Sequence, residues 1–215
     1  MSPKHHPERV FITGTSKGIG LEFARQYAER GARVIATCRR PGEAAELEAI
    51  RSEQADRVTV LSLDVTDAES IERAARATEQ AVDGLDLLIN NAGDGADGEH
   101  GLGHIRQSEM LRILSTNAVG PVLVAQALYP LLKRGENARV VNISSGVAFI
   151  RDTDDPPGRQ YSYPGSKAAL NAFVRKMAAD MKPHGITAVA MGPGFVLTDM
   201  TRGNPNPPPL RPPES

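Results

Sequence analysis

Apolar runs and helix-length polar stretches alternate along most of the chain. Six runs rich in Val, Ile and Leu predict buried strands, because short continuous apolar segments are typical of strands covered on both faces. These expected strands are 9–13, 32–38, 57–65, 85–93, 138–145 and 185–191. The segments between them predict helices at 18–31, 42–54, 66–82, 107–133 and 161–182. This alternation favours a single α/β domain in which a parallel sheet carries helices on both faces.

The expected helix at 66–82 begins at a cap signal. Thr66 is a residue type that caps helix N-termini, and Glu69 falls in the first turn of the helix. Further along, the glycine-rich loop at 93–104 separates the fourth strand from the helix at 107–133. We therefore expect Thr66 to cap the third helix.

Composition narrows the class of protein. The chain has 215 residues, is 40% hydrophobic and 24% charged, and has a formal net charge of −1, so neither nucleic acid nor a membrane surface is an expected partner. No apolar run approaches the roughly 18 residues of a membrane span, and residues 1–10 lack a signal-peptide core, which favours a cytoplasmic location. Cys38 is the only cysteine, which excludes an internal disulfide and a cysteine-cluster metal site; no metal is expected.

The segment TGTSKGIG, residues 13–20, lies directly between the first expected strand and the helix after it. Gly14, Gly18 and Gly20 let the backbone turn tightly and approach a pyrophosphate, which would rest on the helix N-terminus. A simple strand-to-helix turn is the alternative. The position in the first strand–helix unit favours dinucleotide binding and thus a Rossmann-type, doubly wound sheet.

The end of the second strand bears on cofactor choice. A carboxylate there binds the ribose 2′-hydroxyl of NAD, whereas an arginine accommodates the 2′-phosphate of NADP. Cys38 holds the acidic position, Arg39 follows it, and Lys17 adds a positive charge in the glycine loop. Arg39 and Arg40 as ordinary loop arginines are the alternative. We predict NADP(H), with NAD(H) less favoured.

Tyr163 and Lys167 lie four residues apart in the expected helix at 161–182 and so share one of its faces. An ammonium near the phenol should lower the tyrosine pKa and make it a general acid or base. The alternative is a partly buried tyrosine beside a solvated lysine. Tyr161 does not share the helix face of Lys167, so it is the poorer candidate for the general acid or base.

Several motifs follow one another in a fixed order between residues 9 and 200. They are TGTSKGIG, the pair Asp64–Val65, NNAG at 90–93, STNAVGP, VNISS, YSYPGSK and MGPGFVLTDM. Together they resemble the short-chain dehydrogenase/reductase family. The segments ATCRRP and YSYPGSKAALN are most similar to its carbonyl reductases related to C-factor and sniffer.

The resemblance implies a catalytic set of Asn117, Ser145, Tyr163 and Lys167. Ser145 is preferred to Ser144 as the serine that holds the substrate carbonyl, with both serines merely ending the strand as the alternative. An asparagine within a helix can also simply satisfy local backbone groups.

The resemblance also implies the residues that bind the cofactor. They are Gly14, Ser16, Lys17, Gly18, Ile19, Arg39, Asp64, Val65, Asn91, Ala92, Gly93, Tyr163, Lys167, Pro193, Gly194, Val196 and Thr198.

Two segments depart from the family pattern. The stretch 146–160 lengthens the usual interval between the serine and the tyrosine, and the proline-rich tail 201–215 stands where family members continue to a further helix and a seventh strand. We expect one domain at 1–200, with that helix and strand missing and the sixth strand left at the sheet edge.

The implied function is an NADPH-dependent oxidoreductase that acts on a small carbonyl or alcohol substrate and forms a homodimer. The alternative is an NADP(H)-binding sensor or signalling protein with little turnover, which the shortened C-terminus favours.

Overall fold

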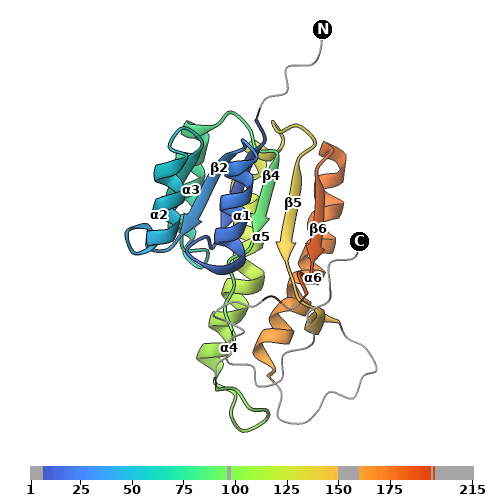
Figure 1. Cartoon of the computed structure of the whole chain (residues 1–215). Coiled ribbons are helices and arrows are strands. Elements are labelled where there is room, and N and C mark those ends of the chain that lie inside the picture. The colour runs from blue at the N-terminus through green and yellow to red at the C-terminus, as the bar shows by residue number, and fades with distance from the viewer. Residues whose placement is uncertain (1–6, 96–97, 150–159, 195, 197–215) are drawn as a thin grey trace, which may run out of the picture.

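The computed structural model describes residues 7–95, 98–149, 160–194 and 196. A parallel sheet forms the centre of this part of the chain (Figure 1). Its strands are β1 (Arg9–Thr13), β2 (Arg33–Cys38), β3 (Val58–Ser62), β4 (Leu87–Asn90), β5 (Arg139–Ile143) and β6 (Thr187–Met191). Their order is β3-β2-β1-β4-β5-β6. The strand order therefore reverses between β1 and β4: β2 and β3 lie on one side of β1, and β4, β5 and β6 lie on the other.

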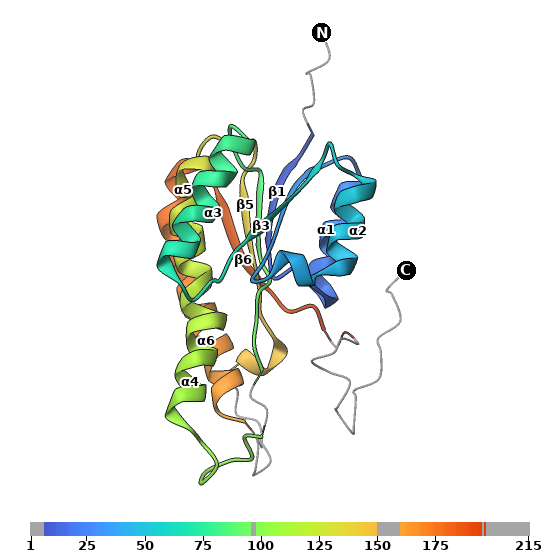
Figure 2. The same cartoon turned by 90° about the vertical axis from the view of Figure 1, so that its left-hand side faces the viewer.

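Helices cover both faces of the sheet, as Figure 2 shows with the sheet seen edge-on. One face carries α1 (Gly18–Glu29) and α2 (Ala45–Glu53), and the other carries α3 (Ala68–Ala81), α5 (Gly120–Leu132) and α6 (Ser162–Met181). The predicted Rossmann-type α/β fold is therefore confirmed.

Each central strand is buried on both of its sides. In β1, Val10 and Ile12 belong to the apolar cluster under α1 and α2, whereas Phe11 belongs to the cluster under α3, α5 and α6. Leu88 of β4 shares the second cluster with Phe11, and Ile89 shares the first. Burial on both sides explains why the strands read as uninterrupted apolar runs.

The expected cap of the third helix was wrong by one residue. Asp67 is the N-cap of α3, and its Oδ1 accepts a hydrogen bond from the amide of Glu69 at 2.9 Å. The Thr66 hydroxyl instead donates to Asp64 Oδ1 at 2.7 Å. Glu69 lies in the first turn as expected. An aspartate forms such a short-range cap as readily as a threonine, so local sequence did not separate the two residues.

The expected helix at 107–133 is interrupted by a wider turn. It consists of α4 (Gln107–Leu114), a π-helical segment (Ser115–Val119) and α5. By length and apolar composition alone, the stretch Gln107–Leu132 is capable of crossing a membrane, contrary to the expectation that no run comes close. Here Val124, Leu128 and Leu132 are buried in the core against the sheet, which is the environment of a core helix.

A buried ion pair joins β1 to the segment before β4. Asp86, almost fully buried, accepts bonds from the Arg9 amide at 2.9 Å, Arg9 Nε at 3.0 Å and Arg9 Nη2 at 2.8 Å. The Glu136 amide donates to Asp86 as well, at 2.7 Å. Arg9 also reaches the exposed carboxylate of Asp83. This network fixes the end of the sheet opposite the strand carboxyl ends.

Strand β6 lies at one edge of the sheet. In the part of the chain that the structure describes, β6 pairs with β5, and its Val189 and Met191 are exposed. The expectation that a further helix and a seventh strand are missing concerns residues outside the described ranges, as does the tail 201–215. The division at residue 200, the homodimer and the cytoplasmic location stay predictions.

Candidate active site

The residues predicted from the motifs gather at the carboxyl ends of the central strands. They come from the turn after β1, the ends of β4 and β5, the π-helical segment and the first turns of α6, toward the lower end of the sheet in Figure 1. In open parallel sheets, this is the edge at which ligands bind.

The glycine loop places residues without side chains at the start of α1. Gly14 and Gly18 have φ angles of 73° and 61°, which side chains other than glycine rarely adopt. A Cβ atom on Gly20 would lie 2.3 Å from Asn91 Nδ2, so only glycine fits there. Lys17 occupies the N-cap position of α1 and makes no side-chain capping bond. Ser16 is exposed and Ile19 is half-buried beside it.

Asn91, directly after β4, ties that strand to the glycine loop. Its Nδ2 donates to the carbonyl oxygens of Thr13 and Gly14, both at 3.0 Å. The amides of Asn91 and Ala92 donate to the Thr13 hydroxyl at 3.0 and 2.9 Å. A Cβ atom on Gly14 would come within 2.7 Å of Ala92 Cα, so the two segments are in direct contact. Asn91 thus holds the loop rather than leaving its amide free for a ligand.

Arg39 and Asp64 lie beside each other after β2 and β3. Arg39 is exposed, and its charge contributes to a lowered Asp64 pKa. Burial raises that pKa, but hydrogen bonds from Thr66 together with Arg39 outweigh it. Arg40 is paired with Glu43 at 3.0 Å. Of Arg39 and Arg40, Arg39 is consequently the one whose charge acts on Asp64.

The structure separates the two serines after β5. Ser144 is buried, and its hydroxyl donates to Asn171 Oδ1 at 2.7 Å. Ser145 lies close enough to the Tyr163 phenol to lower its pKa. The serine chosen by resemblance is therefore the one near the tyrosine.

Lys167 is 4% exposed, although it carries an amino group. Its Nζ donates to the carbonyl oxygen of Ile143 at 2.7 Å and lies 5.8 Å from the centroid of the Tyr163 ring. Burial lowers the pKa of Lys167 to about 8, because the charged form is desolvated. A lysine with this pKa changes its charge close to neutral pH.

The expected lowering of the Tyr163 pKa by Lys167 was wrong for this structure. Burial raises the pKa of Tyr163, and the nearby Ser145 lowers it only in part. The ammonium lies over the ring face and binds a backbone carbonyl, so its charge is not directed at the phenol oxygen. Tyr163 is therefore held in its protonated form, the form that can donate a proton.

Asn117 lies in the π-helical segment and is fully buried. Its amide accepts from the Asp94 amide at 2.7 Å and donates to the Asp94 carbonyl at 2.9 Å. It also donates to the Ser166 hydroxyl at 3.0 Å, which in turn donates to the Tyr163 carbonyl at 2.7 Å. Asn117 thus connects the end of β4 to the helix that carries Tyr163 and Lys167.

The remaining predicted residues lie around this group. A Cβ atom on Gly93 would lie 3.9 Å from Lys167 Nζ, which places the end of NNAG beside the lysine. Val65 is buried in the core, with its carbonyl oxygen facing Gly120 of α5. After β6, Pro193, Gly194 and Val196 are exposed, and Thr198 lies outside the described residues.

Two contributors were missed by sequence reasoning. Ser166 bridges Asn117 and the Tyr163 backbone, and its place directly before Lys167 could have drawn attention to it. Glu99, in the glycine-rich loop after β4, is 5% exposed and contacts the start of α6. Its partners lie 62 and 63 residues away along the chain, so no local pattern indicates it.

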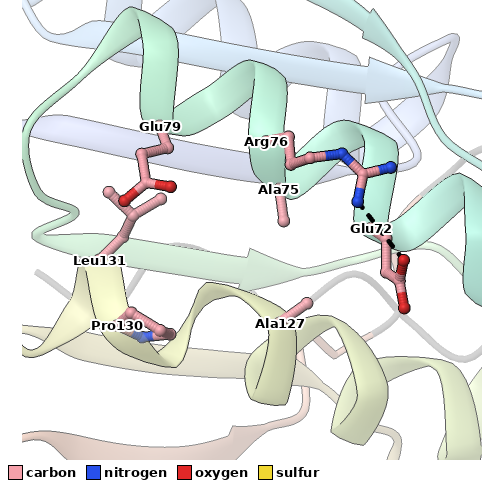
Figure 3. Close-up of a pocket in the computed structure, with 7 residues that line it drawn as sticks. All are labelled: Glu72, Ala75, Arg76, Glu79, Ala127, Pro130 and Leu131. Atoms are coloured by element: carbon pink, nitrogen blue, oxygen red, sulfur yellow. Dashed lines mark hydrogen bonds and ion pairs between the residues drawn. The ribbon is translucent and has the colours of Figure 1, made fainter.

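A surface hollow of about 220 Å³ lies elsewhere, between α3 and α5 (Figure 3). It is lined by Glu72, Ala75, Arg76, Glu79, Ala127, Pro130 and Leu131. Glu72 and Arg76 form an ion pair with each other at 3.4 Å. None of the residues predicted for catalysis or cofactor binding lines it, so the chemistry is assigned to the strand carboxyl ends instead.

Known proteins match the chain over most of its length. Residues 8–207 match the family model of short chain dehydrogenases. A 3-oxoacyl-(acyl-carrier-protein) reductase from Vibrio harveyi is 31% identical over 90% of this chain and 75% of its own length. The structure of NADPH-bound carbonyl reductase from chicken fatty liver has a TM-score of 0.83 at 34% identity, over 91% of this chain and 82% of that one.

The carbonyl reductase Sniffer of Drosophila melanogaster is a second structural match, with a TM-score of 0.83 at 30% identity, over 91% of this chain and 84% of that one. These matches agree with the fold. The chain belongs to the short-chain dehydrogenase family.

Proposed function

We propose that this protein reduces a small ketone, aldehyde or quinone with NADPH, and that Tyr163 is the proton donor. The observation that carries the proposal is the buried Lys167, whose Nζ lies 5.8 Å from the centroid of the Tyr163 ring, with Ser145 near the phenol, at the carboxyl edge of the sheet. The NADPH in the structure of carbonyl reductase from chicken fatty liver supports the choice of cofactor.

The residues at this edge fit a dinucleotide. Gly18 is exposed at the start of α1, and the helix carries no acidic residue in its first turn, which suits a pyrophosphate. Arg39 and Lys17 supply positive charge for a 2′-phosphate, whereas the buried thiol of Cys38 stands where NAD-type sites place a carboxylate. When bound, the nicotinamide supplies hydride to the carbonyl carbon.

The side chains of the protein carry out the proton transfer. Ser145 and Tyr163 hold the carbonyl oxygen of the substrate between their hydroxyls, which fixes the geometry of transfer. Tyr163 then gives its phenol proton to that oxygen and becomes a phenolate. The Lys167 ammonium, which the Ile143 carbonyl holds over the Tyr163 ring, turns toward the phenol oxygen as this negative charge develops and stabilises it.

An assay of the purified protein tests the proposal. NADPH binding is measured by fluorescence, and NADPH oxidation is then followed with a panel of ketones, aldehydes and quinones. Binding with turnover of at least one class of carbonyl is the expected result. Binding without turnover across the panel would favour a sensor role, and absence of binding would overturn the assignment of the glycine loop.

Arg39→Ala should weaken NADPH use while leaving NADH use unchanged. Loss of a charge-assisted contact to the 2′-phosphate should raise the KM for NADPH roughly tenfold or more, since such contacts contribute about 1.5–3 kcal/mol. Arg40→Ala is the matched control, because Arg40 is paired with Glu43. Steady-state kinetics with both cofactors measure the effect. Equal changes in KM for NADPH and NADH would contradict the role of Arg39.

Reduction should slow as the pH rises through about 8, the pKa to which burial lowers Lys167. Below that pH the ammonium is present and stabilises the developing phenolate; above it the lysine is neutral and this stabilisation is lost. The measurement is kcat against pH at saturating NADPH. Lys167→Arg, whose guanidinium stays charged, should move any alkaline decline to higher pH. A decline at the wild-type pH in this variant would exclude Lys167 as its cause.

A further inference from the structure

Helix α6, which carries Tyr163, begins without a cap from its own sequence. Tyr161 occupies the N-cap position with helical backbone angles, φ −95° and ψ −43°, and makes no side-chain capping bond. Pro164 in the first turn has no amide hydrogen. The first amides of a helix have no partner within the helix, so this start needs acceptors from another part of the chain.

Glu99 supplies those acceptors from the loop that follows β4. Its Oε1 accepts from the Tyr161 amide at 3.0 Å, and its two carboxylate oxygens accept from the Ser162 amide at 3.3 and 3.2 Å. Burial raises the pKa of Glu99, but Ser162 and the Tyr161 amide together lower it below its usual value. A negative charge at this end of a helix is favoured by the helix dipole, and these bonds compensate for burying the carboxylate.

The capped turn is the one that contains Tyr163. Residues of the second turn are anchored by other segments, Lys167 by the Ile143 carbonyl and Ser166 by Asn117. Ser166 also donates to the Tyr163 carbonyl, whereas the amides before Tyr163 depend on Glu99. Loss of the Glu99 carboxylate would therefore loosen the tyrosine more than the lysine.

We propose that Glu99 is a positioning residue, which holds the first turn of α6 so that the Tyr163 phenol stays aligned for proton transfer. The proposal rests on the function proposed above, because it assigns a role within that reaction. A displacement of the order of 1 Å of a reacting group costs about 10²-fold in rate.

The first test is kinetic. Glu99→Ala should lower kcat roughly 10- to 100-fold with a much smaller change in the KM for NADPH, since the glycine loop and Arg39 lie elsewhere. Glu99→Gln, which keeps one oxygen acceptor, should recover part of the loss. In a Tyr163→Phe background, Glu99→Ala should cause no further loss, because the group it positions is already gone. Additive losses in the double variant would overturn the proposal.

Asp67→Ala provides the matched control. Asp67 also caps a helix with its carboxylate, by accepting from the Glu69 amide at the start of α3, far along the chain from Tyr163. The Asp67→Ala variant should lose a comparable amount of helix stability but keep the wild-type kcat at saturating NADPH. An equal fall in kcat in both variants would mean that Glu99 acts through general stability only.

Hydrogen exchange separates failure of this proposal from failure of the proposed function. In Glu99→Ala and Glu99→Gln, the amides of residues 161–163 should exchange faster than in the wild type, while those of the second turn stay protected. If the wild type shows no turnover, the proposed reaction is wrong and exchange alone decides whether Glu99 holds this turn. Unchanged exchange in both variants overturns the role of Glu99 whatever the kinetics show.

Discussion

Tyr163→Phe should lower kcat for carbonyl reduction by roughly 10²- to 10⁴-fold, the usual contribution of a positioned general acid. The substitution removes one hydroxyl and leaves the ring that packs near Lys167, so NADPH binding should be retained. The measurement is single-turnover reduction at saturating NADPH, together with fluorescence titration of the cofactor.

Tyr27→Phe is the control for this substitution. Tyr27 lies on α1, and burial raises its pKa as it does for Tyr163, yet it is remote from Ser145 and Lys167. It should leave kcat unchanged. A Tyr163→Phe enzyme that kept the wild-type rate would show that the proton comes from another group, and the assignment of this site would have to be withdrawn.

The largest effect on stability should come from Asp86→Ala. The Arg9 guanidinium would remain buried without its main partner, and loss of one member of a buried ion pair costs about 3–5 kcal/mol. The Glu136 amide would lose its acceptor as well. Urea unfolding should therefore show a free energy of unfolding lower by that amount, with the slope of the transition unchanged.

Asp83→Ala provides the comparison, since Asp83 bonds the same arginine from an exposed position. Its loss should cost about 1 kcal/mol or less, as is usual for exposed ion pairs. Similar losses in the two variants would mean that burial does not set the strength of the Arg9 network. Neither residue is near the proposed active site, so NADPH binding should persist in both folded variants.

The features that the sequence predicted well are those encoded by local patterns. Apolar runs marked the strands, because each one is buried on both of its sides, as Phe11 and Ile12 illustrate. The four-residue spacing of Tyr163 and Lys167 on one helix placed them together, and the resemblance selected the serine that lies near Tyr163. The expected strands and helices differ from the observed ones mainly at their ends.

The features that escaped prediction depend on contacts between distant segments or on burial. Glu99 meets amides more than sixty positions further along, and Asp86 meets Arg9 across 77 positions. The pKa of Tyr163 was expected to fall because the lysine is near in sequence, but the direction depends on desolvation and on where the ammonium points. Spacing along a helix gives neither of these.

The wide turn at Ser115–Val119 limits how this chain can vary. A π-helical turn contains about one residue more than an α-helical turn, so deleting one residue there would restore a regular helix and rotate the side chains on either side of it by about 100° relative to each other. Asn117 would then no longer reach Asp94 and Ser166, or the apolar side of α5 would no longer pack on the sheet. In an alignment or a redesign, the length of this segment is therefore as informative as the identity of the asparagine within it.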